Sequence, residues 1–87
     1  MPNKIVIMVK EIKGTCPHKV GDQVEILGDR VKGNLCPMAF HAIYPYVFAL
    51  QNDAIFPWEK DKDRMLAVCP DQANIVTFEI MRVKIRD

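Results

Sequence analysis

The chain lacks three features that would assign it to a special class of protein: an excess of one charge, a long apolar run, and closely paired cysteines. Lysine plus arginine number 12 and aspartate plus glutamate 11, so no excess of cations is available to neutralise nucleic-acid phosphates. The longest apolar stretch, residues 35–50, is interrupted by His41 and Pro45 and falls short of the ~20 apolar residues that a membrane span requires. We therefore expect neither a nucleic-acid partner nor a membrane partner.

Glycine is also scarce. The 87 residues include 4 glycines, and 49% are hydrophobic and 26% charged, which is the composition of an ordinary folded protein. Nothing divides the chain, so residues 1–87 are expected to form a single domain. The apolar run at residues 5–9 is followed at once by Lys10 and Glu11, too soon for a secretion signal. With an odd number of cysteines, this pattern indicates a cytoplasmic protein with free or metal-bound thiols.

The apolar periodicity predicts a small α+β domain in which one helix crosses an antiparallel sheet, in the order β-β-α-β-β. The expected strands are residues 4–12, 23–27, 65–69 and 75–85. Residues 28–34 carry two glycines and several polar side chains, and are expected to form a polar connection. In the last strand the apolar parity shifts after Ile80, which suggests a bulge near Ile80 and Met81.

A helix is predicted from about Pro37 to Gln51. Asn34 or Cys36 could be its N-cap, and Cys36 would place Pro37 at the first helical position, where proline is well tolerated. The core-facing stripe is Ala39, Phe40, Ile43, Val47 and Leu50. Pro45 should kink or split the helix, since it cannot donate a hydrogen bond to the carbonyl of His41. Apolar side chains also occupy the other faces, so we expect a mostly buried helix and a homo-oligomer formed through residues 37–51.

Every cysteine is followed by proline, at Cys16, Cys36 and Cys69. Together with His18 or His41, these thiols could supply three sulfurs and an imidazole to zinc, or could hold an iron–sulfur cluster. The spacings contain no C-x-x-C pair. If the elements alternate in direction, the loop that carries Cys16 lies at the opposite end of the sheet from Cys36 and Cys69, and would have to fold back to join them.

Two other interpretations of the thiols remain open. Cys36 at a helix N-terminus would be favoured as a thiolate, which suits a nucleophile, a redox sensor or a haem ligand. Alternatively, all three cysteines are small buried side chains at the ends of elements. His18 is expected on an exposed loop and His41 in the interior or at an interface. No set of acid, base and nucleophile can be assembled, so catalysis is the function that the residues support least.

Three stretches resemble a family of short prokaryotic proteins known mainly as conserved and uncharacterised. They are VGD at 20–22, LCPMAFHAIYP at 35–45 and CPDQANIVTFEIMR at 69–82. The resemblance implies a prokaryotic, cytosolic protein and brings no activity, substrate or cofactor with it. The leading hypothesis is therefore metal or small-ligand binding through the three cysteines. The alternative is a non-catalytic interaction module in which the cysteines are structural.

Overall fold

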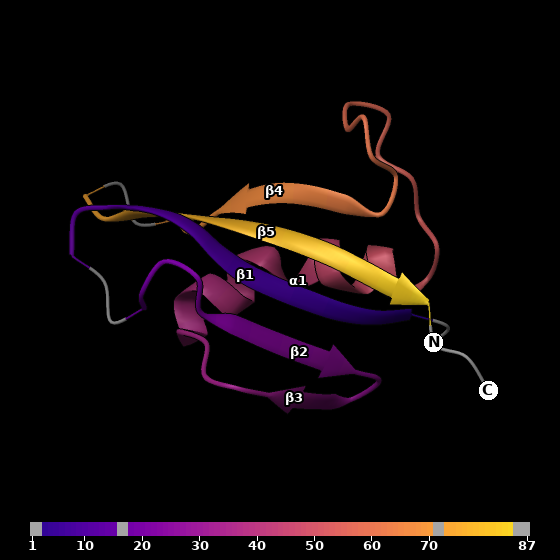
Figure 1. Ribbon diagram of the computed structural model, residues 1–87, viewed down its shortest axis with the longest axis horizontal. Helices are drawn as coiled ribbons and strands as arrows, with labels where there is room; N and C mark the ends of the chain where they lie inside the picture. Colours follow the sequence, from indigo (N-terminus) through magenta and orange to yellow (C-terminus); the bar gives the residue numbers. More distant parts are fainter. Residues whose placement is uncertain (1–2, 16–17, 71–72, 85–87) are drawn as a thin grey trace.

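The computed structural model describes residues 3–15, 18–70 and 73–84, which form one antiparallel sheet and one helix (Figure 1). The elements are β1 (Asn3–Lys13), β2 (Gln23–Leu27), β3 (Arg30–Lys32), α1 (Pro37–Gln51), β4 (Arg64–Val68) and β5 (Ile75–Lys84). The strand order is β3-β2-β1-β5-β4, with every neighbouring pair antiparallel. The α+β class is confirmed. Among the described residues no helix has the length and apolar character that a bilayer crossing needs.

The expected polar connection at 28–34 is wrong, because Arg30–Lys32 form a short edge strand paired with β2. Gly28 and Asp29 link the two strands, and Gly28 has a φ of 62°. A positive φ at the first position of a two-residue hairpin loop is typical of a type II′ turn, and glycine adopts it without strain. The strand escapes a search for apolar runs because Val31 is its only apolar residue.

This extra strand reverses the direction of everything that follows it. In Figure 1 the loop after β1, the start of α1 and the turn between β4 and β5 all lie at the same end of the sheet. The prediction that the loop after β1 lies opposite the start of the helix is therefore wrong. It counted one chain reversal too few.

The core is a single layer between the sheet and α1. Ile5, Ile7 and Val9 of the central strand β1 are almost fully buried there, as are Phe78 and Ile80 of β5. The predicted helix stripe is confirmed at four positions and partly at a fifth: Ala39, Ile43, Val47 and Leu50 are buried, and Phe40 is half-buried. The rest of the helix faces outward, so the described residues bury it on one face only.

Two details of backbone geometry differ from expectation. The register shift lies in β1, between Val9 and Glu11, and not in β5. Lys10 is the extra residue of this β-bulge, whereas Val83, expected to turn inward, is 46% exposed. The helix also continues through Pro45 to Gln51 without a split. Ile43 and Val47, on either side of the proline, are fully buried, so both halves of the helix pack on the sheet.

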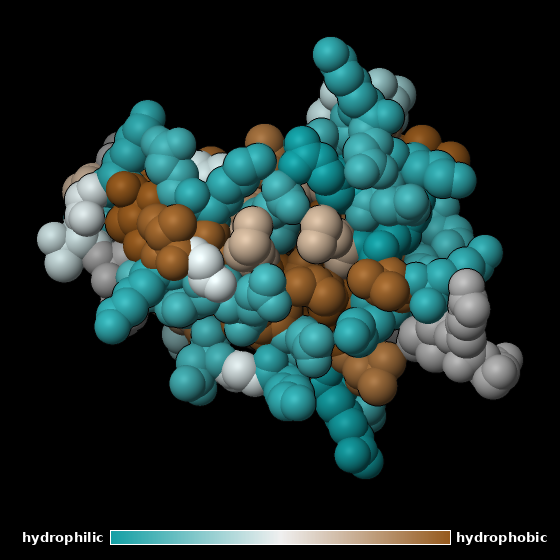
Figure 2. All heavy atoms as spheres, in the orientation of Figure 1, coloured by the Kyte–Doolittle hydropathy of each residue, from teal (hydrophilic) through white to brown (hydrophobic). Residues whose placement is uncertain are grey.

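The opposite face of the sheet is open, and Figure 2 shows it from the side away from the helix. Apolar side chains lie along its middle and hydrophilic ones surround them. Lys4 pairs with Glu25, and both Lys10 and Arg64 pair with Glu79. Antiparallel sheets commonly have one solvated face of this mixed kind.

Candidate functional site at the cysteine end

His18 is a buried residue, only 9% exposed, and the expectation of an exposed loop histidine is wrong. Its ring meets that of Phe78 edge to face, with the centroids 6.2 Å apart. Its Nε2 accepts a hydrogen bond of 3.0 Å from the backbone N–H of Cys36. The imidazole therefore satisfies one donor at the start of α1 that the helix cannot satisfy itself.

This hydrogen bond determines the tautomer that a neutral His18 ring adopts. A ring nitrogen that accepts a hydrogen bond carries no proton, so neutral His18 holds its proton on Nδ1. A metal ion bound by His18 would have to use Nδ1 or replace the bond to Cys36. The protein itself therefore joins His18 of the loop to Cys36 at the helix start through this hydrogen bond.

Cys36, one of the two predicted candidates, stands at the N-cap of α1, with Pro37 at the first helical position. Its φ of −54° and ψ of 130° are extended, the conformation favoured before proline. The side chain makes no capping hydrogen bond and packs, half-buried, against the core. The thiol is therefore free of helix capping and lies at the positive end of the helix dipole.

Cys69 follows β4 and is held by the turn to β5. Its Sγ donates to the carbonyl oxygen of Asn74 and accepts from the backbone N–H of Val76, each at 3.4 Å. Its own N–H donates to the carbonyl oxygen of Val76 at 3.0 Å. The thiol thus takes part in the turn, and the N–H donor to sulfur is also the kind of contact that supports a metal-bound thiolate.

The loop after β1 forms hydrogen bonds both with the turn that holds Cys69 and with the start of α1 at Cys36. The backbone N–H of Thr15 donates to Oδ1 of Asn74 at 2.7 Å, in the turn that holds Cys69. On the other side, His18 accepts the N–H of Cys36. Cys16 and Pro17 lie outside the described residues. Their neighbours in the chain, Thr15 and His18, form hydrogen bonds with the turn after Cys69 and with the backbone of Cys36.

Within residues 3–15, 18–70 and 73–84, no group of three histidine, cysteine or acidic side chains is arranged to hold a metal ion. His18 and Cys36 are brought together, but His18, Cys36 and Cys69 do not by themselves complete a site. His41 is exposed on α1, where it faces a groove beside the β2–β3 hairpin. The structure does not place it in the interior.

A second candidate is the outward side of α1, which we call the helix surface. It consists of exposed apolar residues of the helix and of the connection that follows it: Met38, Tyr44, Tyr46, Phe48, Ile55 and Trp58. Phe56 lies beneath it, with ring centroids 6.1 Å from Tyr46 and 5.1 Å from Trp58. The sequence predicts this apolar character, but not that the connection would extend it.

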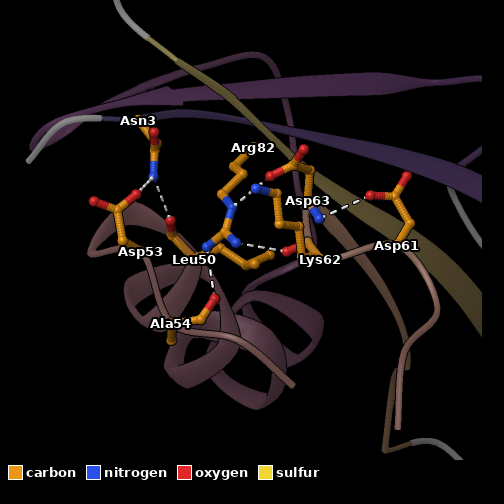
Figure 3. Close-up of polar contacts among 8 residues, drawn as sticks. All are labelled: Asn3, Leu50, Asp53, Ala54, Asp61, Lys62, Asp63 and Arg82. Carbon is orange, nitrogen blue, oxygen red and sulfur yellow. Dashed lines mark hydrogen bonds and ion pairs between the residues drawn. The ribbon is translucent and has the colours of Figure 1, made fainter. Parts of the chain in front are cut away.

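Sequence reasoning missed a polar cluster where the connection after α1 meets the sheet (Figure 3). The Arg82 guanidinium donates to the carbonyl oxygens of Ala54 and Lys62, each at 2.6 Å, and to Oδ1 of Asp63 at 3.0 Å. Asn3 donates to the Leu50 carbonyl oxygen at 2.8 Å. An arginine at a core-facing position of an alternating strand was the available signal, because a buried cation needs partners. The cluster fastens the connection to the sheet.

No model of a known protein family matches the chain, and neither a curated protein nor a solved structure does.

Proposed function

We propose that the cysteine end of the protein binds a soft metal ion, with zinc as the first choice, through Cys16, Cys36, Cys69 and the imidazole of His18. One observation carries the proposal: the residues on either side of Cys16 and Pro17 form hydrogen bonds with the turn after Cys69 and with the backbone of Cys36. Thr15 is bound to the turn of Cys69, and His18 to the backbone of Cys36. Three thiolates and one imidazole are a common ligand set for structural zinc.

Local features favour thiolate ligands. The N-terminus of α1 stabilises negative charge at Cys36. The Val76 N–H would remain a hydrogen-bond donor to a thiolate at Cys69. An iron–sulfur cluster or a small thiol-binding ligand would use the same residues. We also propose that the protein is prokaryotic and cytoplasmic, because thiols stay reduced in the cytoplasm. We further propose that it belongs to the uncharacterised family that its sequence resembles.

The test is metal analysis of protein purified without oxygen. We expect about one zinc per chain, and a melting temperature that falls when a chelator is added. Cys16→Ser, Cys36→Ser and Cys69→Ser should each lose the metal, whereas the control His41→Asn should retain it. Absorbance in the visible range would indicate an iron–sulfur cluster instead. Metal binding would be refuted if the purified protein held no metal or chromophore and if its melting temperature did not change when a chelator was added.

The helix surface supports a second function, that of a non-catalytic interaction module whose partner is another copy of this chain. Tyr44, Tyr46, Phe48 and Trp58 are 37–65% exposed. These side chains offer roughly 400 Å² of surface, with Tyr44 on the hairpin side of the helix and Tyr46 and Trp58 on the β4 side. A standard interface needs about 800 Å² from each partner, so the rest must come from neighbouring side chains, of which Met38 and Ile55 are 56% and 67% exposed. No lysine, arginine or acid interrupts α1, as suits the centre of a homodimer interface.

Sedimentation across a range of concentrations tests this second function. We expect a dimer in the wild type and a monomer in Phe48→Ser, because the substitution removes an aromatic contact from the middle of the helix surface. Val20→Ser is the control, since Val20 is 64% exposed but lies on the β1–β2 loop. A wild type that stays monomeric at high concentration would contradict the proposal.

A further inference from the structure

A groove of about 680 Å³ lies between α1 and the β2–β3 hairpin. This volume is within the range of small-molecule sites in proteins. Ile26 and Val31 contribute one wall from the hairpin, and Phe40, Tyr44 and Pro45 contribute the other from the helix. The groove is independent of the thiols discussed above.

The walls suit an aromatic ring. Phe40 and Tyr44, one helical turn apart, meet edge to face with their centroids 5.4 Å apart. Tyr44 is 41% exposed and Val31 is 45% exposed, so apolar surface remains for a ligand to cover. Aromatic rings prefer the offset or edge-on packing that this pair leaves available.

The groove carries a negative charge at the end formed by Asp29. Asp29, at the tip of the hairpin, is the only acidic residue among those lining it, and no lysine or arginine is among them. Arg30 and Lys32 of β3 pair across the hairpin with Leu27 and Glu25, whose parity points to the open face of the sheet. His41 and Tyr44 are the other two polar side chains of the lining.

The end of the helix adds to the negative potential near Asp29. Nε2 of Gln51, the last residue of α1, donates to the carbonyl oxygen of Gly28 at 3.2 Å, so the hairpin tip is held against the helix C-terminus. That terminus has no basic side chain in its last turn to offset its partial negative charge. Oε1 of Gln51 is buried without a hydrogen-bond donor from the described part of the chain.

We propose that this groove binds an amine that carries an aromatic ring. The ring packs between the hairpin wall and Tyr44, and the ammonium group lies toward Asp29 and the helix C-terminus. A cation beside Phe40 and Tyr44 gains a further attraction from the electron-rich faces of the rings. A carboxylate in the position of the ammonium group would be repelled by Asp29 and by the helix C-terminus.

The experiment is an NMR titration of the ¹⁵N-labelled protein at neutral pH with 2-phenylethylamine and, separately, with 3-phenylpropionate. We expect the amine to shift the amide signals of Asp29, Val31 and Tyr44 and to bind at least fivefold more tightly than the acid. Asp29→Asn should weaken amine binding about two- to fivefold, the usual size of an exposed charge pair. Glu11→Gln removes the same charge from an exposed site on β1 and should leave binding unchanged.

Equal binding of amine and acid would overturn the proposal, as would an Asp29→Asn variant that binds the amine like the wild type. Shifts confined to the Trp58 side of the helix, or no shifts at about millimolar amine, would also overturn it. If the groove signals instead move only with protein concentration, the occupant is a second copy of the chain, and the amine proposal fails.

Discussion

Arg82 occupies a position in β5 at which strand alternation turns its side chain toward the helix side of the sheet. Its side chain is 7% exposed, although it carries a permanent charge. Three oxygen atoms of the 54–63 segment receive its donors, and its backbone N–H donates to the Asp63 carbonyl oxygen at 2.8 Å. One residue therefore fastens the longest connection of the fold.

Replacing Arg82 should destabilise the protein strongly. We expect Arg82→Met to lower the free energy of unfolding by about 2–4 kcal/mol, because two carbonyl oxygens and a carboxylate lose a charged donor. Urea unfolding measures the change. Lys84→Met is the control: Lys84 is exposed two positions further along the strand, and its replacement should cost less than about 0.5 kcal/mol. Equal losses for the two variants would show that the guanidinium contacts are not the cause.

Gly14 and Gly21 offer a matched pair of substitutions. Both have positive φ, 104° and 95°. An added Cβ at Gly14 would lie 2.5 Å from Asn74 Oδ1 and 2.9 Å from the Ala73 carbonyl oxygen, whereas at Gly21 it meets nothing within 4 Å. Gly14 thus permits the close contact between the loop after β1 and the β4–β5 turn.

Gly21→Ala should cost only the backbone strain, about 1–2 kcal/mol in thermal unfolding. Gly14→Ala should cost about 1–3 kcal/mol more, because the new methyl group displaces the turn. If the cysteine end binds metal, the Gly14→Ala variant should also bind it more weakly than Gly21→Ala. A Gly14→Ala variant as stable as Gly21→Ala would mean that the contact with Asn74 is not tight.

At the scale of elements, the two edges of the sheet are both protected. The edge strand β3 has 3 residues and presents Arg30 and Lys32. At the other edge, the N–H of Leu66 in β4 is occupied by Oε2 of Glu59 at 3.3 Å. Short strands and charged side chains at an edge oppose pairing with the edge of another chain. Any self-association should therefore use the faces of the molecule.

Glu59→Ala should remove part of this protection. The variant exposes the Leu66 N–H on β4, so we expect faster growth of light scattering during slow heating, and binding of an amyloid-sensitive dye. Lys60→Ala is the control, because Lys60 is exposed in the same turn and its substitution removes a charge without affecting a contact to the strand. An aggregation rate that is the same in both variants would show that the edge contact has no protective role.

Across the whole molecule, chemistry is divided between three regions. The cysteine end holds the coupled His18 and Cys36, the groove holds Asp29, and the far end holds the Arg82 cluster that maintains the fold. The open face of the sheet is stabilised by surface ion pairs, which individually contribute little. A substitution in one region can therefore test that region with little effect on the others.

Much of the fold was predictable because it follows from local patterns. The helix follows from a short stretch of chain: proline starts it at Pro37, and the spacing of Ile43, Val47 and Leu50 gives it one apolar face. The alternation of Ile5, Ile7 and Val9 likewise defines the inner face of a strand. The burial of His18 was not predictable, since it depends on a contact with Cys36, 18 residues away.

The sequence by itself determined the class of fold, the bounds of α1, the core faces of the main strands, and the Cys-Pro pairs as the unusual chemistry. Only the tertiary structure decided which ends of the elements meet. A strand of 3 residues with one apolar side chain leaves no periodic signal, because hydrogen bonds to β2 define it rather than burial. Yet it reverses the direction of the helix, and so brings Cys36 to the end of the sheet where His18 lies.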